Sequence, residues 1–508
     1  MQMDSNFNLI DEPWIPISGH GLVSLEDIFT DRSLTSLGGT PIEKIALTKL
    51  LLAIAQAAIT PNNESEWEAL GADGLAAKCR AYLAQWYDRF YLYGDQPFLQ
   101  IPAIKQAKVQ SFGALLPEVS TGNATVLTHS NRQKNLDDDE KARLLVTLMS
   151  MALGGKKTDN SITLSSDYRG KLNARNKPST SKPGPGVAHM GLLHTFINAE
   201  TLIETLWFNL LTHQKISQIN LYSQGIGTPP WEAMPAGENC PVARSLLQSL
   251  VGRLVPLSRF CLLGDDGLHY SEGIAYANYK EGSHDLSVSV KSDGKLIKAL
   301  WTSPGKRPWR ELSSLLSFLS GDRNTGFQCM QLRLVFHRMR SRTEKFSIWS
   351  GGLKVSSNAG EQYVTGGDDF VESRYQLKSA NLGQNWFALF KNEMDSLDKL
   401  SKKLYRGVMQ YHARQKMDGA SKAAAATNQF WQLCERYAQM LIDSCDQTDS
   451  TKSSLINIRK RFANFISKTY DQFCPRQTAR QMTAWAGCRP NISKYLKKTE
   501  EISNDGRH

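Results

Sequence analysis

The sequence predicts an α+β protein, with an irregular mixed α/β N-terminal domain followed by a C-terminal four-helix bundle. Over roughly the first 375 of the 508 residues, short strand patterns and helical patterns mix without the regular alternation of a doubly wound sheet. After residue 381, apolar residues recur every three or four positions, as on the buried faces of bundled helices. We therefore place the mixed domain at 1–378, the four-helix bundle at 381–497 and a disordered tail at 498–508.

The N-terminal elements begin with a short strand within residues 7–19, which Pro13 and Pro16 restrict to the edge of a sheet because proline cannot donate to a strand ladder. Helices follow at 40–59 and 65–93, where the apolar residues keep helical spacing. These elements would supply the first part of the N-terminal core.

The middle of the chain predicts one further helix and several strands. Residues 137–152 open with three aspartates, which suit a helix N-terminus, and Gly154–Gly155 is expected to close this helix as a C-terminal cap. An Asp-Gly pair between two strand-like runs predicts a hairpin. The expected strands are 194–199, the hairpin at 284–303, 332–340 and 345–352.

The predicted bundle consists of four segments with apolar stripes. The fourth stripe is the weakest, and we expect its helix to bend or restart at Pro490 because proline lacks a backbone donor. Polar connections of about 4 to 15 residues suit the turns of a bundle. The four stripes occupy 387–408, 430–441, 455–466 and 479–498.

The net charge of +11 is concentrated toward the C-terminus. Residues 381–508 carry 21 Lys and Arg against 12 Asp and Glu, whereas the rest of the chain is nearly neutral. A basic module beside a neutral body favours a nucleic-acid partner. A charged surface that only keeps the protein soluble gives the same pattern.

The sequence predicts a cytoplasmic protein that does not enter a membrane. Its longest apolar stretch, Ile45–Ile59, is short for a membrane span and contains Lys49 and Gln56. The N-terminus lacks a basic region followed by an apolar one, so we expect no signal peptide. Eight scattered cysteines without a Cys-x-x-Cys pair indicate reduced thiols.

Catalytic signatures are absent, so we expect a binding protein that is not an enzyme and uses no cofactor or metal. The stretch "GGKKTDNS" lacks the spacing and the strand-to-helix context of a phosphate-binding loop for ATP. His189 and His194 are spaced unsuitably for shared metal ligation. The Gly-Asp-Asp stretches at 264–266 and 367–369 are more typical of turns than of Mg²⁺ sites.

Three polar segments are candidates for binding. Residues 154–186 carry seven Lys and Arg against two Asp, in a context rich in Ser, Gly, Asn and Pro, which suits contact with a polyphosphate backbone. Residues 118–135 form a long polar loop with a small apolar tip. In 347–362 a strand ends at two glycines and a turn follows, whose short polar side chains can reach base edges in a groove. The alternatives are a helix cap whose lysines face the negative end of the helix dipole for the first segment, an ordinary surface loop for the second and a plain turn for the third.

Three motifs and the bundle together resemble one family. "NLIDEPWIPI" at 8–17, "YGDQPFLQIP" at 93–102 and "TPPWE" at 228–232 occur in the order found in the CasA-type large subunit of Cascade, the type I-E CRISPR surveillance complex. The resemblance implies a non-catalytic subunit that recognises the protospacer-adjacent motif (PAM) in double-stranded DNA and wedges the duplex open. It also implies three further partners, namely a CRISPR guide RNA, the other Cascade subunits and a recruited helicase-nuclease.

The resemblance also implies roles for individual residues. A glycine loop on DNA matches Gly154 and Gly155, although two lysines replace the family's further glycines. Shorter serines stand where family members carry amides in the wedge hairpin, and Leu127 replaces an aromatic. The expected DNA-binding residues are Gly154, Gly155, Lys156, Lys157, Lys354, Ser356, Ser357, Asn358 and, outside any clear match, Lys280. The expected contacts with guide RNA or a partner are Leu127, Thr128 and His129.

Two other classes of function stay open at this point. The chain can be a metal-dependent nuclease with dispersed ligands, for which Asp265–Asp266 and Asp368–Asp369 are the first candidates. It can also be a scaffold that holds other subunits without touching DNA. Nuclease activity with Mg²⁺ would support the first alternative, and assembly without a DNA crosslink to this chain would support the second.

Overall fold

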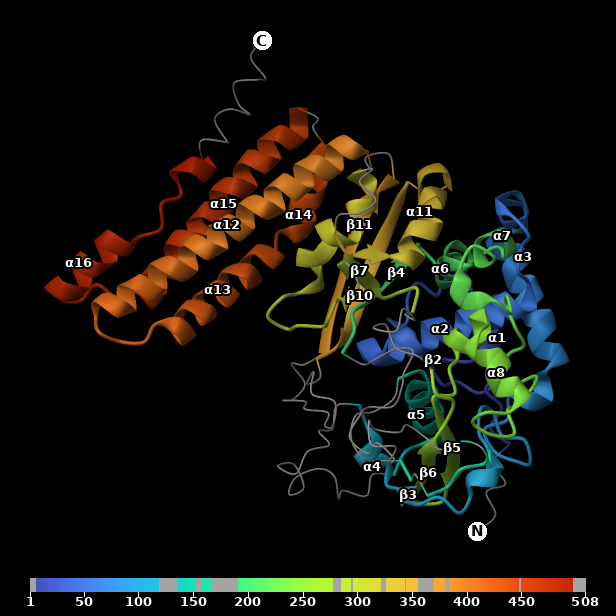
Figure 1. The fold of residues 1–508 in the computed structure, drawn as a ribbon. Coiled ribbons are helices and arrows are strands. Elements are labelled where there is room, and N and C mark those ends of the chain that lie inside the picture. The colour runs from blue at the N-terminus through green and yellow to red at the C-terminus, as the bar shows by residue number, and fades with distance from the viewer. Residues whose placement is uncertain are drawn as a thin grey trace. The chain divides into compact units, whose positions relative to one another are not determined.

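The computed structural model describes most of the chain, and every structural statement below refers to that part. The described residues are 6–117, 135–151, 158–159, 161–166, 168, 191–276, 285–293, 296–320, 326–342, 344–354, 370–379, 383–446 and 449–496. Figure 1 draws the remaining residues as a thin grey trace.

The chain divides into two units (Figure 1). The N-terminal unit comprises Met1–Pro308, Phe327–Arg342 and Phe346–Arg374. The C-terminal unit comprises Trp309–Gly326, Thr343–Lys345 and Tyr375–His508. Among the described residues, no helix is long and apolar enough to cross a membrane.

The strands form small antiparallel sheets rather than one large sheet. A two-stranded sheet pairs β1 with β2, and the three-stranded sheets have the orders β11-β10-β4, β3-β6-β5 and β8-β7-β9. The strands are β1 (Ile15–Ile17), β2 (Gly21–Val23), β3 (Val109–Gln110), β4 (His194–Asn198), β5 (Arg259–Gly264), β6 (Gly267–Glu272), β7 (Ser289–Asp293), β8 (Leu296–Ala299), β9 (Gln328–Cys329), β10 (Lys345–Leu353) and β11 (Phe370–Lys378). The expected edge strand, the strand at 194–199, the hairpin at 284–303 and the strand at 345–352 are confirmed.

Helices of the N-terminal unit pack against β4 and β5. The helices of this unit are α1 (Leu25–Thr30), α2 (Pro41–Ala58), α3 (Glu64–Gln85), α4 (Phe112–Leu115), α5 (Asp138–Ser150), α6 (Leu202–Asn209), α7 (His213–Ile216), α8 (Pro241–Leu247), α9 (Leu250–Leu254) and α11 (Met330–Arg342). Helix α2 is the central one, since it packs against α3, α5, α6 and α9. A capping box between Thr40 and Glu43 and the proline at Pro41 define its start.

The residues of the three family-like motifs lie mostly in the core. The Trp14 indole donates a hydrogen bond to the Leu9 carbonyl at 2.9 Å, which closes the first motif on itself. Phe98 of the second motif stacks on Phe90 at 4.9 Å between ring centroids, and Trp231 of the third motif packs against both rings. The motif residues therefore serve core packing. The fold brings the second and third motifs together although they lie far apart in the sequence.

Two predictions about secondary structure are wrong. Residues 332–340 form part of α11 instead of a strand, because Leu332, Val335, Phe336 and Met339 all lie on one buried helical face. Helix α5 ends at Ser150, so Gly154–Gly155 does not provide its C-terminal cap. Met151 adopts an extended conformation, and its buried side chain enters the core instead of continuing the helix.

The C-terminal unit is helical. Its helices are α10 (Leu312–Leu315), α12 (Gln384–Arg414), α13 (Ala420–Glu435), α14 (Ala438–Asp443), α15 (Asp449–Phe473) and α16 (Ala479–Cys488). Helices α12, α13 and α15 lie side by side, and α16 packs on α12 (Figure 1). The stripe at 430–441 is divided between α13 and α14. Helix α16 ends before Pro490 and residues 493–496 are helical again, so the expected restart at this proline is confirmed. A buried ion pair between Glu393 and Arg459 joins α12 to α15.

Candidate nucleic-acid interface

Helix α5 positions the start of the glycine-lysine segment. A capping box between Asp137 and Glu140 fixes its first turn, and its buried face packs on α2. At its other end, the Met149 carbonyl accepts a hydrogen bond from the Ser258 hydroxyl at 2.9 Å, which ties the helix to the residue before β5. Residues 152–157, and with them Gly154, Gly155, Lys156 and Lys157, lie outside the described residues.

The described chain resumes at Thr158, beside the hairpin of β5 and β6. The Asp159 amide donates to the Tyr270 carbonyl of β6 at 2.8 Å, and its carboxylate accepts from the Lys108 amide at 2.9 Å. Residue Ser258 precedes β5, whose first residue Arg259 pairs with the last residue of β6. Both ends of the glycine-lysine segment are therefore tied to the β5-β6 hairpin, near the end at which β5 begins.

Strands β10 and β11 form the stem of the expected wedge hairpin. Gly351 and Gly352 near the end of β10 are required by close packing, because a Cβ at Gly351 would lie 2.6 Å from the Trp349 ring and a Cβ at Gly352 would lie 2.2 Å from Thr302 Oγ1. Lys354 follows β10 and is exposed. Ser356, Ser357 and Asn358 lie outside the described residues, and the chain resumes at β11.

The other expected contact residues also fall outside the described residues. Leu127, Thr128 and His129 belong to 118–134, between α4 and α5, and Lys280 belongs to 277–284. Tyr276 precedes that second stretch, and its hydroxyl donates to the Gly252 carbonyl at 2.7 Å. The assignments made from the sequence therefore stay predictions, and Lys354 is the one expected contact residue that the structure describes.

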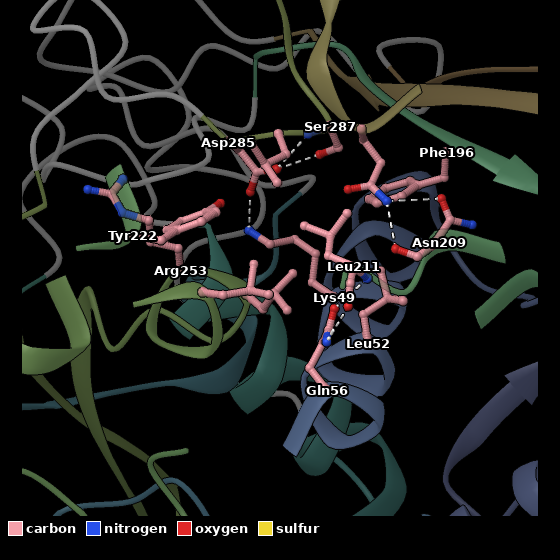
Figure 2. Close-up of a pocket in the computed structure, with 14 residues that line it drawn as sticks. Lys49, Leu52, Gln56, Phe196, Asn209, Leu211, Tyr222, Arg253, Asp285 and Ser287 are labelled. Atoms are coloured by element: carbon pink, nitrogen blue, oxygen red, sulfur yellow. Dashed lines mark hydrogen bonds and ion pairs between the residues drawn. The ribbon is translucent and has the colours of Figure 1, made fainter. Parts of the chain in front are cut away.

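A buried charge pair fixes the point at which the chain returns from 277–284. The Lys49 ammonium extends from α2 to the Asp285 carboxylate at 2.5 Å (Figure 2). The Lys49 side chain is fully buried, and that of Asp285 is 8% exposed. The pair borders a small cavity of about 20 Å³, which Tyr222 and Arg253 also line. The isolated lysine in an apolar helix was visible in the sequence, but its partner lies too far along the chain to be identified there.

The groups around this pair act together electrostatically. The Asp285 carboxylate accepts bonds from the Ser287 amide at 2.9 Å and the Ser287 hydroxyl at 2.7 Å. Burial opposes ionisation, but the Lys49 ammonium and these bonds hold the pKa of Asp285 well below its ordinary value. His194 Nδ1 lies 2.8 Å from the Ser287 hydroxyl, and burial lowers the pKa of His194 to about 4. These bonds anchor the backbone at Asp285 in a nearly buried environment.

The described part of the chain gives no support to a metal centre. Within it, no group of three or more His, Cys, Asp or Glu is placed to hold a metal ion. Asp265–Asp266 is the turn between β5 and β6, as expected for the first Gly-Asp-Asp stretch. Asp368–Asp369 and His189 lie outside the described residues.

Comparison with known proteins identifies the family. The family model described as CRISPR-associated protein Cse1 matches residues 8–469. The chain belongs to the Cse1 family. Cse1 and CasA are two names for this family, which is that of the large subunit of type I-E Cascade, so the resemblance seen in the three motifs is confirmed.

Individual Cse1 relatives agree with this assignment. The CasA/Cse1 protein of Thermus thermophilus is 26% identical over 338 residues, which span 61% of this chain and 60% of that relative. The crystal structure of Thermobifida fusca Cse1 has the same fold, with a TM-score of 0.78 at 21% identity over 98% of each chain. A chain of a solved CRISPR RNA-guided surveillance complex matches with a TM-score of 0.61 at 13% identity, covering 97% of this chain and 99% of its own length. The mixed N-terminal region followed by a helical C-terminal region is therefore the Cse1 fold.

Proposed function

We propose that this chain is the large, non-catalytic subunit of an RNA-guided Cascade complex. In this proposal it recognises the PAM in double-stranded DNA, opens the adjacent duplex and helps to recruit a helicase-nuclease. Its partners are the target DNA, the CRISPR guide RNA and the other Cascade subunits. The Cse1 match over residues 8–469 is the observation that carries the proposal. The solved surveillance complex that contains a chain of this fold supports it.

The proposed DNA contacts divide into positioning and reading. Lys156 and Lys157 would bind phosphates and hold the duplex, which contributes affinity but no sequence information. Lys354 and the residues 356–358 would enter the minor groove, where A·T and G·C pairs are distinguished but A·T and T·A are not. This limited code suits recognition of several short related motifs.

Opening of the duplex would need no nucleotide hydrolysis. Separating a base-pair step costs about 1.4 kcal/mol, and a hydrogen bond to a charged group contributes about 1.5–3 kcal/mol. A few lysine-phosphate contacts and one inserted turn are therefore sufficient to open the first one or two pairs. Guide RNA pairing would then extend the opened region.

The proposal is tested by duplex binding of the assembled complex over a range of salt concentrations. Lys156→Ala/Lys157→Ala should lower affinity for all duplexes and reduce the salt slope by about 2, since about 0.9 counterion is released per phosphate contact. Ser356→Ala/Ser357→Ala/Asn358→Ala should instead change the preference among PAM sequences.

The matched control is Lys78→Ala/Arg80→Ala, which removes two positive charges from an exposed part of α3. This variant should bind DNA like the parent. Parent-like affinity, salt slope and motif preference in both test variants would contradict the assigned DNA contacts.

A further inference from the structure

A second cavity, of about 310 Å³, lies within the N-terminal unit beneath the stem of the β10-β11 hairpin. Its walls come from α2, α6 and the β11-β10-β4 sheet, and include Thr48, Leu202, Phe196 and Trp349. The volume is at the lower end of the range for small-ligand sites. It is separate from the small cavity beside Lys49, although the Phe196 side chain borders both.

The strand pattern explains why these side chains line one cavity. Phe196 and Asn198 are two positions apart on β4, so they share one face of the sheet. Trp349 of β10 is paired with Phe196, and the two rings lie 6.3 Å apart at 30°. The sheet therefore offers an aromatic wall with an amide at its end.

The charged groups leave the cavity with one unpaired positive side chain. The Lys44 ammonium contacts both carboxylate oxygens of Glu372 at 2.8 Å, so these two charges neutralise each other. Arg374, two positions along β11, is exposed. Residues Asn198 and Arg374 both line the cavity, and within the described part of the chain neither side chain has a hydrogen-bond or ion-pair partner.

This combination matches the chemistry of an unpaired nucleotide. Unpaired bases are recognised by aromatic or guanidinium planes and by groups that bond their Watson–Crick edges, and an asparagine amide provides both a donor and an acceptor. A guanidinium is the preferred side chain for a phosphate. A purely apolar ligand would leave the amide and the guanidinium unused.

We propose that this cavity binds one unpaired nucleotide, with the base at the wall formed by Phe196 and Trp349, the base edge at Asn198 and the phosphate at Arg374. The site itself is argued from the cavity. Only the source of the nucleotide, a strand bound by the complex, rests on the proposed function. Because the cavity lies under the hairpin stem, an occupant would contact both strands that carry the wedge.

The test is calorimetric titration of the full-length chain with AMP, CMP, GMP and UMP, and with ribose 5-phosphate as the probe that lacks a base. At least one mononucleotide should bind more tightly than ribose 5-phosphate. Arg374→Ala should weaken binding about tenfold, as expected for a lost charge-assisted hydrogen bond. Thr48→Phe, which fills the cavity, should abolish it.

Arg333→Ala is the matched control, because it removes an exposed arginine of the same unit that does not line the cavity. It should bind nucleotides like the parent, and all variants should keep the parent's circular dichroism spectrum. Tighter binding of a ten-residue single strand than of the mononucleotides would identify a nucleotide within a strand, whereas equal binding would identify a free one. Either result supports the site.

The proposal is overturned if neither the mononucleotides nor the single strand bind, or if Arg374→Ala and Thr48→Phe both bind like the parent. Equal competition by an acidic tetrapeptide would also overturn it, since the site would then recognise charge alone. Lys156→Ala/Lys157→Ala should leave mononucleotide binding unchanged. Mononucleotide binding therefore tests the cavity proposal independently of the duplex binding that tests the proposed function.

Discussion

Replacing Lys49 with methionine tests whether the buried ion pair fixes the chain at Asp285. Methionine keeps most of the apolar stem but removes the ammonium, which leaves a carboxylate that is 8% exposed and that accepts from the Ser287 amide and hydroxyl. Removing one partner of a buried pair typically costs 3–5 kcal/mol. For a unit of this size we expect Tm to fall by roughly 5 °C in scanning calorimetry of the full chain.

The double variant Lys49→Met/Asp285→Asn provides the control. It removes both charges, so it should recover at least half of the lost free energy of unfolding, because the main penalty is the unpaired buried carboxylate. A loss below about 1 kcal/mol in the single variant would refute the reasoning. A double variant less stable than the single one would refute it as well.

The pH dependence supplies a second check on the same pair. Because the pKa of Asp285 is held below its ordinary value of 3.8, its stabilising effect is present above that value and is lost as pH falls through the folded-state pKa. In Lys49→Met, burial without the ammonium should raise the pKa of Asp285, and protonation then relieves the penalty. The difference in Tm between parent and variant should therefore shrink between pH 7 and pH 4.

Two further predictions concern the framework of the N-terminal unit. The Glu64 carboxylate of α3 contacts His337 and accepts hydrogen bonds from Arg338, both on α11. Burial raises the pKa of Glu64, but these contacts outweigh it and hold the pKa well below its ordinary value. Glu64→Gln should lower the free energy of unfolding by about 2 kcal/mol at pH 7, with a smaller effect below pH 4, as measured by urea denaturation. Gly351→Ala should cost about 1–3 kcal/mol in the same assay, because its methyl group would meet the Trp349 ring, and a parent-like midpoint would contradict this packing.

The sequence predicts those parts of the fold whose signal is local and repeated. The stripes of α12 and α15 and the apolar length of α2 give clear helical patterns, so these helices were expected close to their observed positions. The strand predicted at 332–340 is wrong because a short apolar run suits a strand as well as a helix. Tertiary burial of one helical face decides between the two.

The long-range features of the site could not be predicted. Lys49 and Asp285 meet where α2 and residues 285–287 line the same small cavity, and no local pattern links them. The same holds for Asn198 and Arg374, which share a cavity only because β4 and β11 flank β10. The DNA and guide-RNA contact residues and the domain limits 1–378 and 381–497 stay predictions from the sequence.

The central claim is that this subunit opens DNA by binding alone. The most direct measurement is the fluorescence of 2-aminopurine placed in the first base pairs beside the PAM of a duplex, with the assembled complex and without ATP. The account predicts a rise in fluorescence that requires this subunit and that is lost in Ser356→Ala/Ser357→Ala/Asn358→Ala. An equal rise in complexes that lack the subunit, or a rise only when ATP is added, would contradict it.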